Sequence, residues 1–255
     1  MVGKLNLSDH RYNYPYKGFT SIFNQIIVLA KIHYNLYGNY NVFVEDYQIL
    51  NLFDNMYIPH SGDTTYNVSD IFFEDFFAGK YENDYNAHKL VNIDDLKTRQ
   101  ISKFLKYKDE VLVEFLKIKE NLFGLNKFIG VQIRGTDKNT ELPSIKIDNV
   151  ITHIDAAIEK YPTHKIFIAT DDNTYLSIIR DKYGSKVVFN EGHMISYNGN
   201  PLHTNHVNRE RVNREVMLDV YLLSCCDYIL YSFSNVSFLA LSIMENHKKE
   251  IININ

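Results

Sequence analysis

The sequence predicts an α/β protein whose C-terminal half forms a doubly wound, mostly parallel sheet. Three observations support this fold class. Strand-like apolar runs alternate with helical patterns after residue 125, which is typical of parallel strands joined by right-handed crossovers. Polar residues follow several of these strands at once, where open α/β sheets bind ligands. An apolar fraction of 45% in 255 residues is sufficient for a substantial core.

The chain changes character near residue 125, so we predict two domains, an N-terminal α/β domain over residues 1–124 and a Rossmann-like domain over residues 125–255. In the first domain, residues 18–38 have helical periodicity and residues 41–46 are strand-like. Residues 94–124 predict one or two amphipathic helices that end near Gly124.

The second domain has the clearer pattern. Its predicted elements are strand 127–134, helix 148–160, strand 165–170, helix 174–182, strand 186–189, a loop over 190–205, helix 207–224, strand 227–231, helix 236–246 and a strand at 250–253.

Composition excludes several classes of protein. A formal net charge of −4 argues against general nucleic-acid binding. Cys225 and Cys226 are adjacent on a predicted helix, where neighbours diverge too far for an ordinary disulfide, so we expect a reducing compartment. No stretch reaches the roughly 20 apolar residues of a membrane span, and the start lacks a signal-peptide core. We therefore predict a cytoplasmic protein with no integral membrane segment.

The stretch GVQIRGTDKNTE, residues 130–141, places polar residues at the end of a predicted strand. Arg134 suits an anion, because a guanidinium forks onto phosphate oxygens and stays charged when partly buried. Gly135 would let the backbone approach a ligand, and Thr136 would add a hydroxyl. The alternative is an arginine–carboxylate pair at a surface turn that begins with Asp137.

A second polar pair follows the strand IFIAT, where Asp171 and Asp172 precede a helix. The two carboxylates have the chemistry to bind Mg²⁺ or Mn²⁺, or the hydroxyls of a ligand. The alternative, which we favour slightly, is that they begin the helix as ordinary N-cap residues.

The helix predicted over 207–224 carries Asp219 among apolar residues. A carboxylate there is costly unless it finds partners, and a guanine base offers two adjacent N–H donors; the alternative is a solvent-facing position. The stretch SFSN, residues 232–235, ends the next strand, and its hydroxyls at a helix start are typical of a phosphate cradle and also of N-caps.

Histidines 193, 203 and 206 surround one predicted loop, but no cysteine or carboxylate set completes a zinc site, so we predict no metal centre. No serine or cysteine occupies a nucleophile elbow either.

These stretches together resemble the α1,6-fucosyltransferases, a group that includes rhizobial nodulation fucosyltransferases. IGVQIRGTDK is similar to the family motif His-Val-Arg-Arg-Thr-Asp-Lys, and IFIATDD to the strand and Thr-Asp-Asp turn that follow it. LDVYLLSCCDYILYSFSNVSFLALSIM is similar to the next helix-strand-helix segment. Order and spacing agree across residues 128–244. Earlier, GFTSIFNQIIVLA is faintly similar to the Gly-rich loop and helix that open these catalytic domains.

The resemblance implies a two-domain glycosyltransferase B-type enzyme that uses GDP-fucose, inverts the sugar and needs no metal or other cofactor. Arg134 would bind the β-phosphate and Asp219 the guanine, with a glycan as acceptor. By position, further donor-binding residues would be Gln132, Gly135, Asp171, Asp172, Ser232, Ser234 and Asn235. The sequence departs from the family at three of these: Gln132 replaces a histidine, Gly135 an arginine and Asn235 a serine.

The transfer step needs a base for the incoming hydroxyl. Glu141 is our candidate, tuned by Lys138, and Asp137 is the second choice, although a solvated loop carboxylate remains an equal interpretation of Glu141. Asn24 and Gln25 follow the Gly-rich loop and are either donor or acceptor contacts or the first turn of a helix. Residues 190–206 are a candidate acceptor or lid loop.

Two other functions fit the same residues. The departures from the family motif are compatible with a catalytically silent GDP-sugar or glycan-binding protein of the same fold. Asp171 and Asp172 are compatible with a metal-dependent hydrolase or nucleotidyl enzyme, which EDTA would inactivate. No pattern specifies an oligomeric state.

Overall fold

The computed structural model describes residues 2–6, 42–45, 65–67, 107–136, 145–197, 199, 202, 209–232, 234–244 and 249–251. The chain separates into two compact units, Met1–Leu112 and Val113–Asn255, and each is treated by itself below. Within the described ranges, no helix is long and apolar enough to cross a membrane.

The described part of the first unit contains a three-stranded parallel sheet in the order β2-β1-β3 and ends in the first turn of the helix Asp109–Phe123. Its strands are β1 (Val2–Asn6), β2 (Val42–Glu45) and β3 (Thr65–Asn67). Strand β2 lies within the range predicted for it, 41–46. The helix predicted over 18–38 lies outside the described residues.

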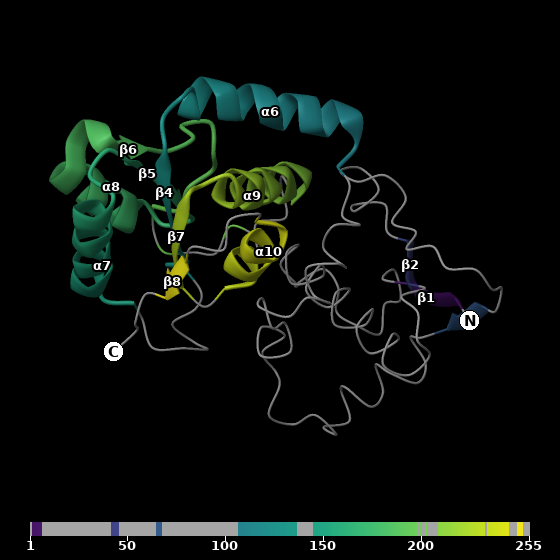
Figure 1. The fold of residues 1–255 in the computed structure, drawn as a ribbon. Coiled ribbons are helices and arrows are strands. Elements are labelled where there is room, and N and C mark those ends of the chain that lie inside the picture. Colours follow the sequence, from purple (N-terminus) through teal and green to yellow (C-terminus); the bar gives the residue numbers. More distant parts are fainter. Residues whose placement is uncertain are drawn as a thin grey trace. The chain divides into compact units, whose positions relative to one another are not determined.

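The second unit is built on a five-stranded sheet in the order β6-β5-β4-β7-β8, in which every neighbouring pair is parallel (Figure 1). The strands are β4 (Phe128–Ile133), β5 (Lys165–Thr170), β6 (Val187–Val188), β7 (Tyr228–Tyr231) and β8 (Lys249–Ile251). The helices are α6 (Asp109–Phe123), α7 (Ile147–Lys160), α8 (Asn173–Tyr183), α9 (Arg209–Ser224) and α10 (Asn235–Ile243), with a short 3-10 turn at Gly184–Lys186. The predicted α/β class with a parallel sheet is confirmed.

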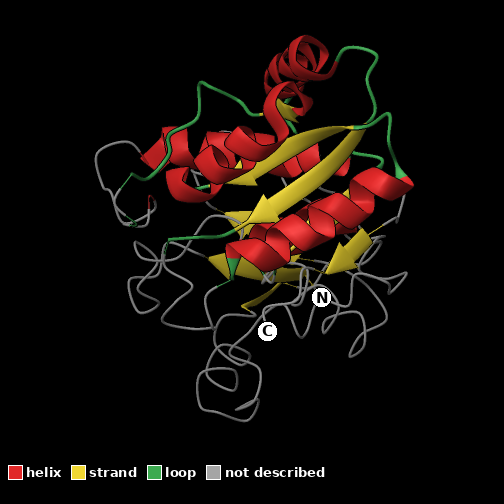
Figure 2. Ribbon diagram, turned by 90° about the vertical axis from the view of Figure 1, so that its left-hand side faces the viewer, coloured by secondary structure: helices red, strands yellow, loops and turns green. Residues whose placement is uncertain are grey.

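Helices cover the two faces of this sheet, as Figures 1 and 2 show. On one face, Ile129, Val131 and Ile133 of β4 pack into an apolar cluster with buried residues of α7 and α8. On the other face, Gly130 lies against the end of α9, where a Cβ atom would come 2.9 Å from the sulfur of Cys226. All residues of β4 are buried, as expected for a central strand between two helical layers.

The element boundaries follow the sequence patterns closely, with one correction. Helix α6 ends at Phe123, and Gly124 then takes a positive φ of 52°, as a residue after a helix commonly does. The helix predicted over 236–246 ends instead at Ile243, because Met244 adopts an extended backbone with ψ 132°. Met244 extends the apolar run of the helix by one residue, so no local stop signal marks its end at Ile243.

Candidate functional site

The polar residues singled out after β4, β5 and β7 lie at one edge of the sheet. Ile133 pairs with Thr170, and Gln132 pairs with Tyr231, so the three parallel strands end at the same level. The segments that begin at Arg134, Asp171 and Ser232 therefore meet at the carboxyl edge, where ligands bind in sheets of this type.

Asp171 fastens the loop that follows β4. Its Oδ1 accepts a hydrogen bond from the Gly135 backbone N–H at 3.0 Å, and its Oδ2 accepts one from the Thr136 hydroxyl at 2.7 Å. Both carboxylate oxygens are thus engaged by the neighbouring segment. This carboxylate holds in place the segment that begins with the half-buried Arg134.

Asp172 is the N-cap of α8. Its Oδ1 accepts from the Thr174 N–H at 2.7 Å, while its own N–H donates to the Thr170 hydroxyl at 3.3 Å. This is the N-cap interpretation considered for the Asp171–Asp172 pair. In the described part of the chain, no three His, Cys, Asp or Glu side chains gather into a metal site.

Gly135 packs closely against the side chains of Asp172 and Tyr175. A Cβ atom there would lie 2.6 Å from the Asp172 Cβ and 2.9 Å from the Tyr175 Cε2. The Tyr175 hydroxyl donates to the Ile145 carbonyl at 2.6 Å, which fixes the ring. Burial, with Asp172 and Asp171 nearby, raises the pKa of Tyr175 and keeps its phenol protonated for that bond. Glycine is required here by packing.

Gln132 is at the centre of a buried polar cluster. Its Oε1 lies 2.9 Å from the Ser232 hydroxyl, 3.0 Å from that of Ser234 and 2.6 Å from that of Ser237. All four residues are buried. An interior hydroxyl is stable only when it is hydrogen-bonded, so the cluster locks the segment after β7 onto the end of β4.

Ser234 is the N-cap of α10 and accepts from the Ser237 N–H at 3.1 Å. The helix begins with Asn235, so its first N–H groups lie beside the end of β4. Helix N-termini bind anions through such unsatisfied N–H groups and the positive end of the helix dipole. Sequence reasoning missed Ser237, although its spacing of three residues from Ser234 is an available signal.

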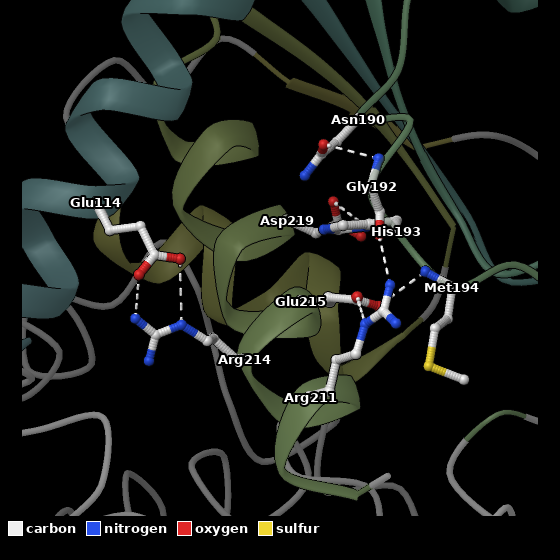
Figure 3. Close-up of polar contacts among 9 residues, drawn as sticks. All are labelled: Glu114, Asn190, Gly192, His193, Met194, Arg211, Arg214, Glu215 and Asp219. Atoms are coloured by element: carbon white, nitrogen blue, oxygen red, sulfur yellow. Dashed lines mark hydrogen bonds and ion pairs between the residues drawn. The ribbon is translucent and has the colours of Figure 1, made fainter.

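Asp219 lies beside His193, which comes from the loop after β6 (Figure 3). The His193 Nδ1 and the Asp219 Oδ1 are 3.3 Å apart, and the two side chains are 5% and 14% exposed. The geometry is that of an ion pair without an aligned hydrogen bond, and Oδ1 has no hydrogen-bond partner among the described residues. Asp219 is therefore largely enclosed, in contrast to the solvent-facing alternative.

Charges around this pair come from α9 and from Asp171, which follows β5. Burial would lower the pKa of His193, but Asp219 and then Glu215 outweigh it, so the pKa is raised despite the opposing Arg211. Burial also raises the pKa of Asp219 most strongly; His193 counteracts this, while Glu215 and Asp171 add to it. Each group thus shifts the pKa of the other toward its charged form.

The loop that carries His193 is tied to α9 (Figure 3). Glu215 accepts from the Met194 N–H at 2.8 Å and from the Arg211 Nε at 2.7 Å, and Arg211 also donates to the Gly192 carbonyl at 2.8 Å. Arg214, further along α9, pairs with Glu114 of α6. The part of the candidate lid loop that the structure describes is thus held against α9.

Several predicted residues lie outside the described part of the chain. They are Asn24, Gln25, Asp137, Lys138, Glu141, His203 and His206. Their roles remain predictions from the sequence.

The chain matches the family of alpha-(1,6)-fucosyltransferase N- and catalytic domains over residues 98–253. No curated protein sequence matches it.

Solved structures of fucosyltransferases resemble this one. The NodZ fucosyltransferase from Bradyrhizobium is 15% identical at a TM-score of 0.55, with 89% of this chain and 88% of that chain covered. NodZ α-1,6-fucosyltransferase soaked with GDP-fucose gives 15% identity and a TM-score of 0.54, covering 89% of each chain. A variant of FUT1 from Arabidopsis thaliana in complex with GDP is 11% identical at a TM-score of 0.56, with coverages of 94% and 69%.

The match is narrower for a selenomethionine NodZ crystal structure, where it covers 46% of that chain at a TM-score of 0.41. Identities this low establish the fold alone, whereas the family match spans well over half of the chain and includes β4, β5, β7 and α10. The predicted resemblance is confirmed, and the chain belongs to the alpha-(1,6)-fucosyltransferase family of glycosyltransferases.

Proposed function

We propose that this protein transfers fucose from GDP-fucose to a hydroxyl of a glycan, with inversion and without a required metal. Family membership supports the reaction class. The observation that carries the proposal is the arrangement at the carboxyl edge of the sheet. An arginine at the end of the central strand β4 and a serine-capped helix N-terminus after the adjacent β7 supply two positive groups for a diphosphate.

Donor binding then follows from the chemistry of these groups. Arg134 binds the β-phosphate through charge-assisted hydrogen bonds, and the first turn of α10, with Asn235, binds phosphate oxygens. Gln132 and Ser232 hold that turn against β4 through the buried hydroxyl cluster. Asp219 accepts hydrogen bonds from the guanine N–H groups.

The transfer is a single displacement at the fucose anomeric carbon. The acceptor oxygen bonds to this carbon while the bond to the β-phosphate oxygen breaks, and GDP leaves with the electron pair. Arg134 and the α10 N-terminus stabilise the charge that develops on the diphosphate. Glu141 takes the acceptor proton, with Lys138 adjusting its pKa and Asp137 as the second choice for the base.

We also propose the two-domain, glycosyltransferase B-type arrangement, with a doubly wound sheet in the domain over residues 125–255 and the acceptor side in residues 1–124. Asn24 and Gln25 contribute from that first domain. Asp171 and Asp172 support the donor cleft indirectly, because the structure uses their oxygens to fix the loop after β4 and the start of α8.

Calorimetric titration with GDP and GDP-fucose, in EDTA, tests donor binding. Arg134→Ala should weaken GDP binding by about 10- to 100-fold, because a hydrogen bond to a charged group contributes about 1.5–3 kcal/mol. Arg180→Ala is the matched control, since Arg180 pairs with Glu191 at the surface and should leave binding unchanged. Absence of GDP binding to the wild type, or binding that EDTA abolishes, would refute the proposal.

Turnover is measured separately, as GDP release in the presence of glycan acceptors. Glu141→Gln should bind GDP-fucose normally and lose turnover. A wild type that binds donor without turning over on any acceptor, and that Glu141→Gln leaves unaltered, would identify the catalytically silent protein instead.

A further inference from the structure

In the His193–Asp219 pair, each side chain has a buried polar atom without a hydrogen-bond partner among the described residues. The Asp219 Oδ1 is enclosed against His193, so the 14% of this side chain that is exposed does not include that oxygen. The carboxylate thus has an inner oxygen that faces a nearly fully buried imidazole. The His193 Nε2 is also buried, with no hydrogen-bond partner among the described residues. A histidine this enclosed has little scope to contact a ligand directly, but it lies against Asp219, the carboxylate for which guanine binding is proposed.

The other charged side chains near the pair are hydrogen-bonded to other groups. Arg211 donates to Glu215 and to the Gly192 carbonyl, so its charge is shared with another carboxylate. Glu215 in turn accepts from Arg211 and the Met194 N–H, and Asp171 binds the loop after β4. Among the described residues, His193 is the basic side chain that lies within ion-pair distance of Asp219, and it carries a charge there when protonated.

We propose that His193 is a positioning residue for donor binding: it holds Asp219 as an oriented carboxylate, ready to accept the N–H groups of the guanine base. The proposal rests on the proposed function, in which Asp219 binds guanine. The recognising state is then protonated His193 beside ionised Asp219. Because each group shifts the pKa of the other, replacing either residue changes the protonation of its partner.

This state has a limited pH window. His193 has its pKa raised from the ordinary 6.5, chiefly by Asp219 against the effect of burial, so its proton is present below that raised pKa and is lost as pH rises through it. The carboxylate form of Asp219, whose pKa burial raises from 3.8, is lost as pH falls through the raised value.

The test is GDP affinity as a function of pH for the wild type and His193→Gln. In the wild type, affinity should fall as pH rises through the raised pKa of His193, where the imidazole loses its proton, by at most tenfold per pH unit for a single proton. In His193→Gln, no imidazolium lowers the pKa of Asp219, so affinity should instead rise with pH as the Asp219 carboxylate ionises. Opposite slopes are the signature of a positioning role.

His164→Gln is the matched control. His164 is buried, with its Nε2 3.9 Å from Asp227, but this pair lies just before β5 and β7, at the opposite end of the strands. Its variant should keep the wild-type slope. A His193→Gln profile parallel to the wild type would overturn the inference, because a merely structural histidine would lower affinity equally at every pH.

Circular dichroism checks that each variant folds, and His193→Asn replaces the glutamine variant if it does not. A second test uses the wild type alone: saturating GDP should shift the imidazole NMR signals of His193 and leave those of His164 unchanged. Unmoved His193 signals would also overturn the inference. Failure of the proposed function is distinct, since the wild type would then bind no GDP at any pH, or Asp219→Asn would bind it normally.

Discussion

Replacing Gly135 by alanine tests the packing that fixes the loop after β4. The added Cβ would lie 2.6 Å from the Asp172 Cβ, 2.8 Å from its Oδ2 and 2.9 Å from the Tyr175 Cε2. Carbon atoms in contact prefer about 3.5–4.0 Å, so a shift of about 1 Å is needed. Neither neighbour yields easily, because Asp172 caps α8 and the Tyr175 hydroxyl is bound to the Ile145 carbonyl.

The magnitude follows from these contacts. Overpacking of this kind costs about 1–3 kcal/mol, and the lower entropy of the unfolded alanine chain offsets about 0.4–1 kcal/mol of that. We expect Gly135→Ala to lower the free energy of unfolding by about 1–2 kcal/mol. Urea denaturation followed by circular dichroism measures it as a lower midpoint with an unchanged slope.

Gly192→Ala is the control for this prediction. The nearest atom to a Cβ at Gly192 is the Asn190 Oδ1 at 3.5 Å, an ordinary contact, and its backbone lies outside the left-handed region. Its free energy of unfolding should change by less than about 0.5 kcal/mol. If Gly135→Ala unfolds at the same urea midpoint as Gly192→Ala, the close packing of the loop against Asp172 is wrong.

Two further substitutions probe the edge of the sheet. Asp172→Ala removes the N-cap of α8 and should destabilise the protein by about 1 kcal/mol in urea denaturation, with Asp172→Asn restoring most of the loss. Ser237→Ala removes a hydroxyl that lies 2.6 Å from the Gln132 Oε1 and 2.7 Å from the Ser232 carbonyl. It should cost about 1–2 kcal/mol and also weaken GDP binding in calorimetry, because the start of α10 loosens; destabilisation with unchanged affinity would contradict that coupling.

Much of the second unit was predictable because its elements carry strong local signals. The strand 165–170 was placed at its observed bounds, since an apolar run ends abruptly at two aspartates that begin a helix. The start of α10 was predicted within one residue, because the stretch SFSN offers N-cap residues just before it. The end of α10 was not predicted, because Met244 is apolar like the helix before it and no local pattern indicates its extended backbone.

The site was harder to predict, because its contacts join residues distant in sequence. Arg134, Asp171 and Ser234 could be brought to one edge by the alternation of strands and helices alone. The partner of Asp219 could not, since His193 is 26 positions away in a loop. The packing beside Gly135 could not be predicted either, because the Asp172 and Tyr175 side chains that an added Cβ would meet come from the start of another helix.

The departures from the family motif have separate physical explanations at two positions. Gln132, in place of a histidine, accepts from the hydroxyls of the buried cluster, and no side-chain atom of that cluster is among those buried without a hydrogen-bond partner in the described part of the chain. Gly135, in place of an arginine, fits a space that admits no Cβ. At the third, Asn235 needs no hydroxyl for capping, because Ser234 supplies the cap.

If the donor site had lost its function, we would expect buried polar groups without hydrogen-bond partners at the substituted positions, since nothing would maintain their hydrogen bonds. The substituted positions here are instead consistent with their surroundings, and arginine at 135 would collide with Asp172 before its guanidinium reached any ligand. In the proposed function, Arg134 and the α10 N-terminus carry the diphosphate charge without a second arginine at position 135. Donor binding in this protein should therefore depend more steeply on Arg134 than in a relative that has two arginines.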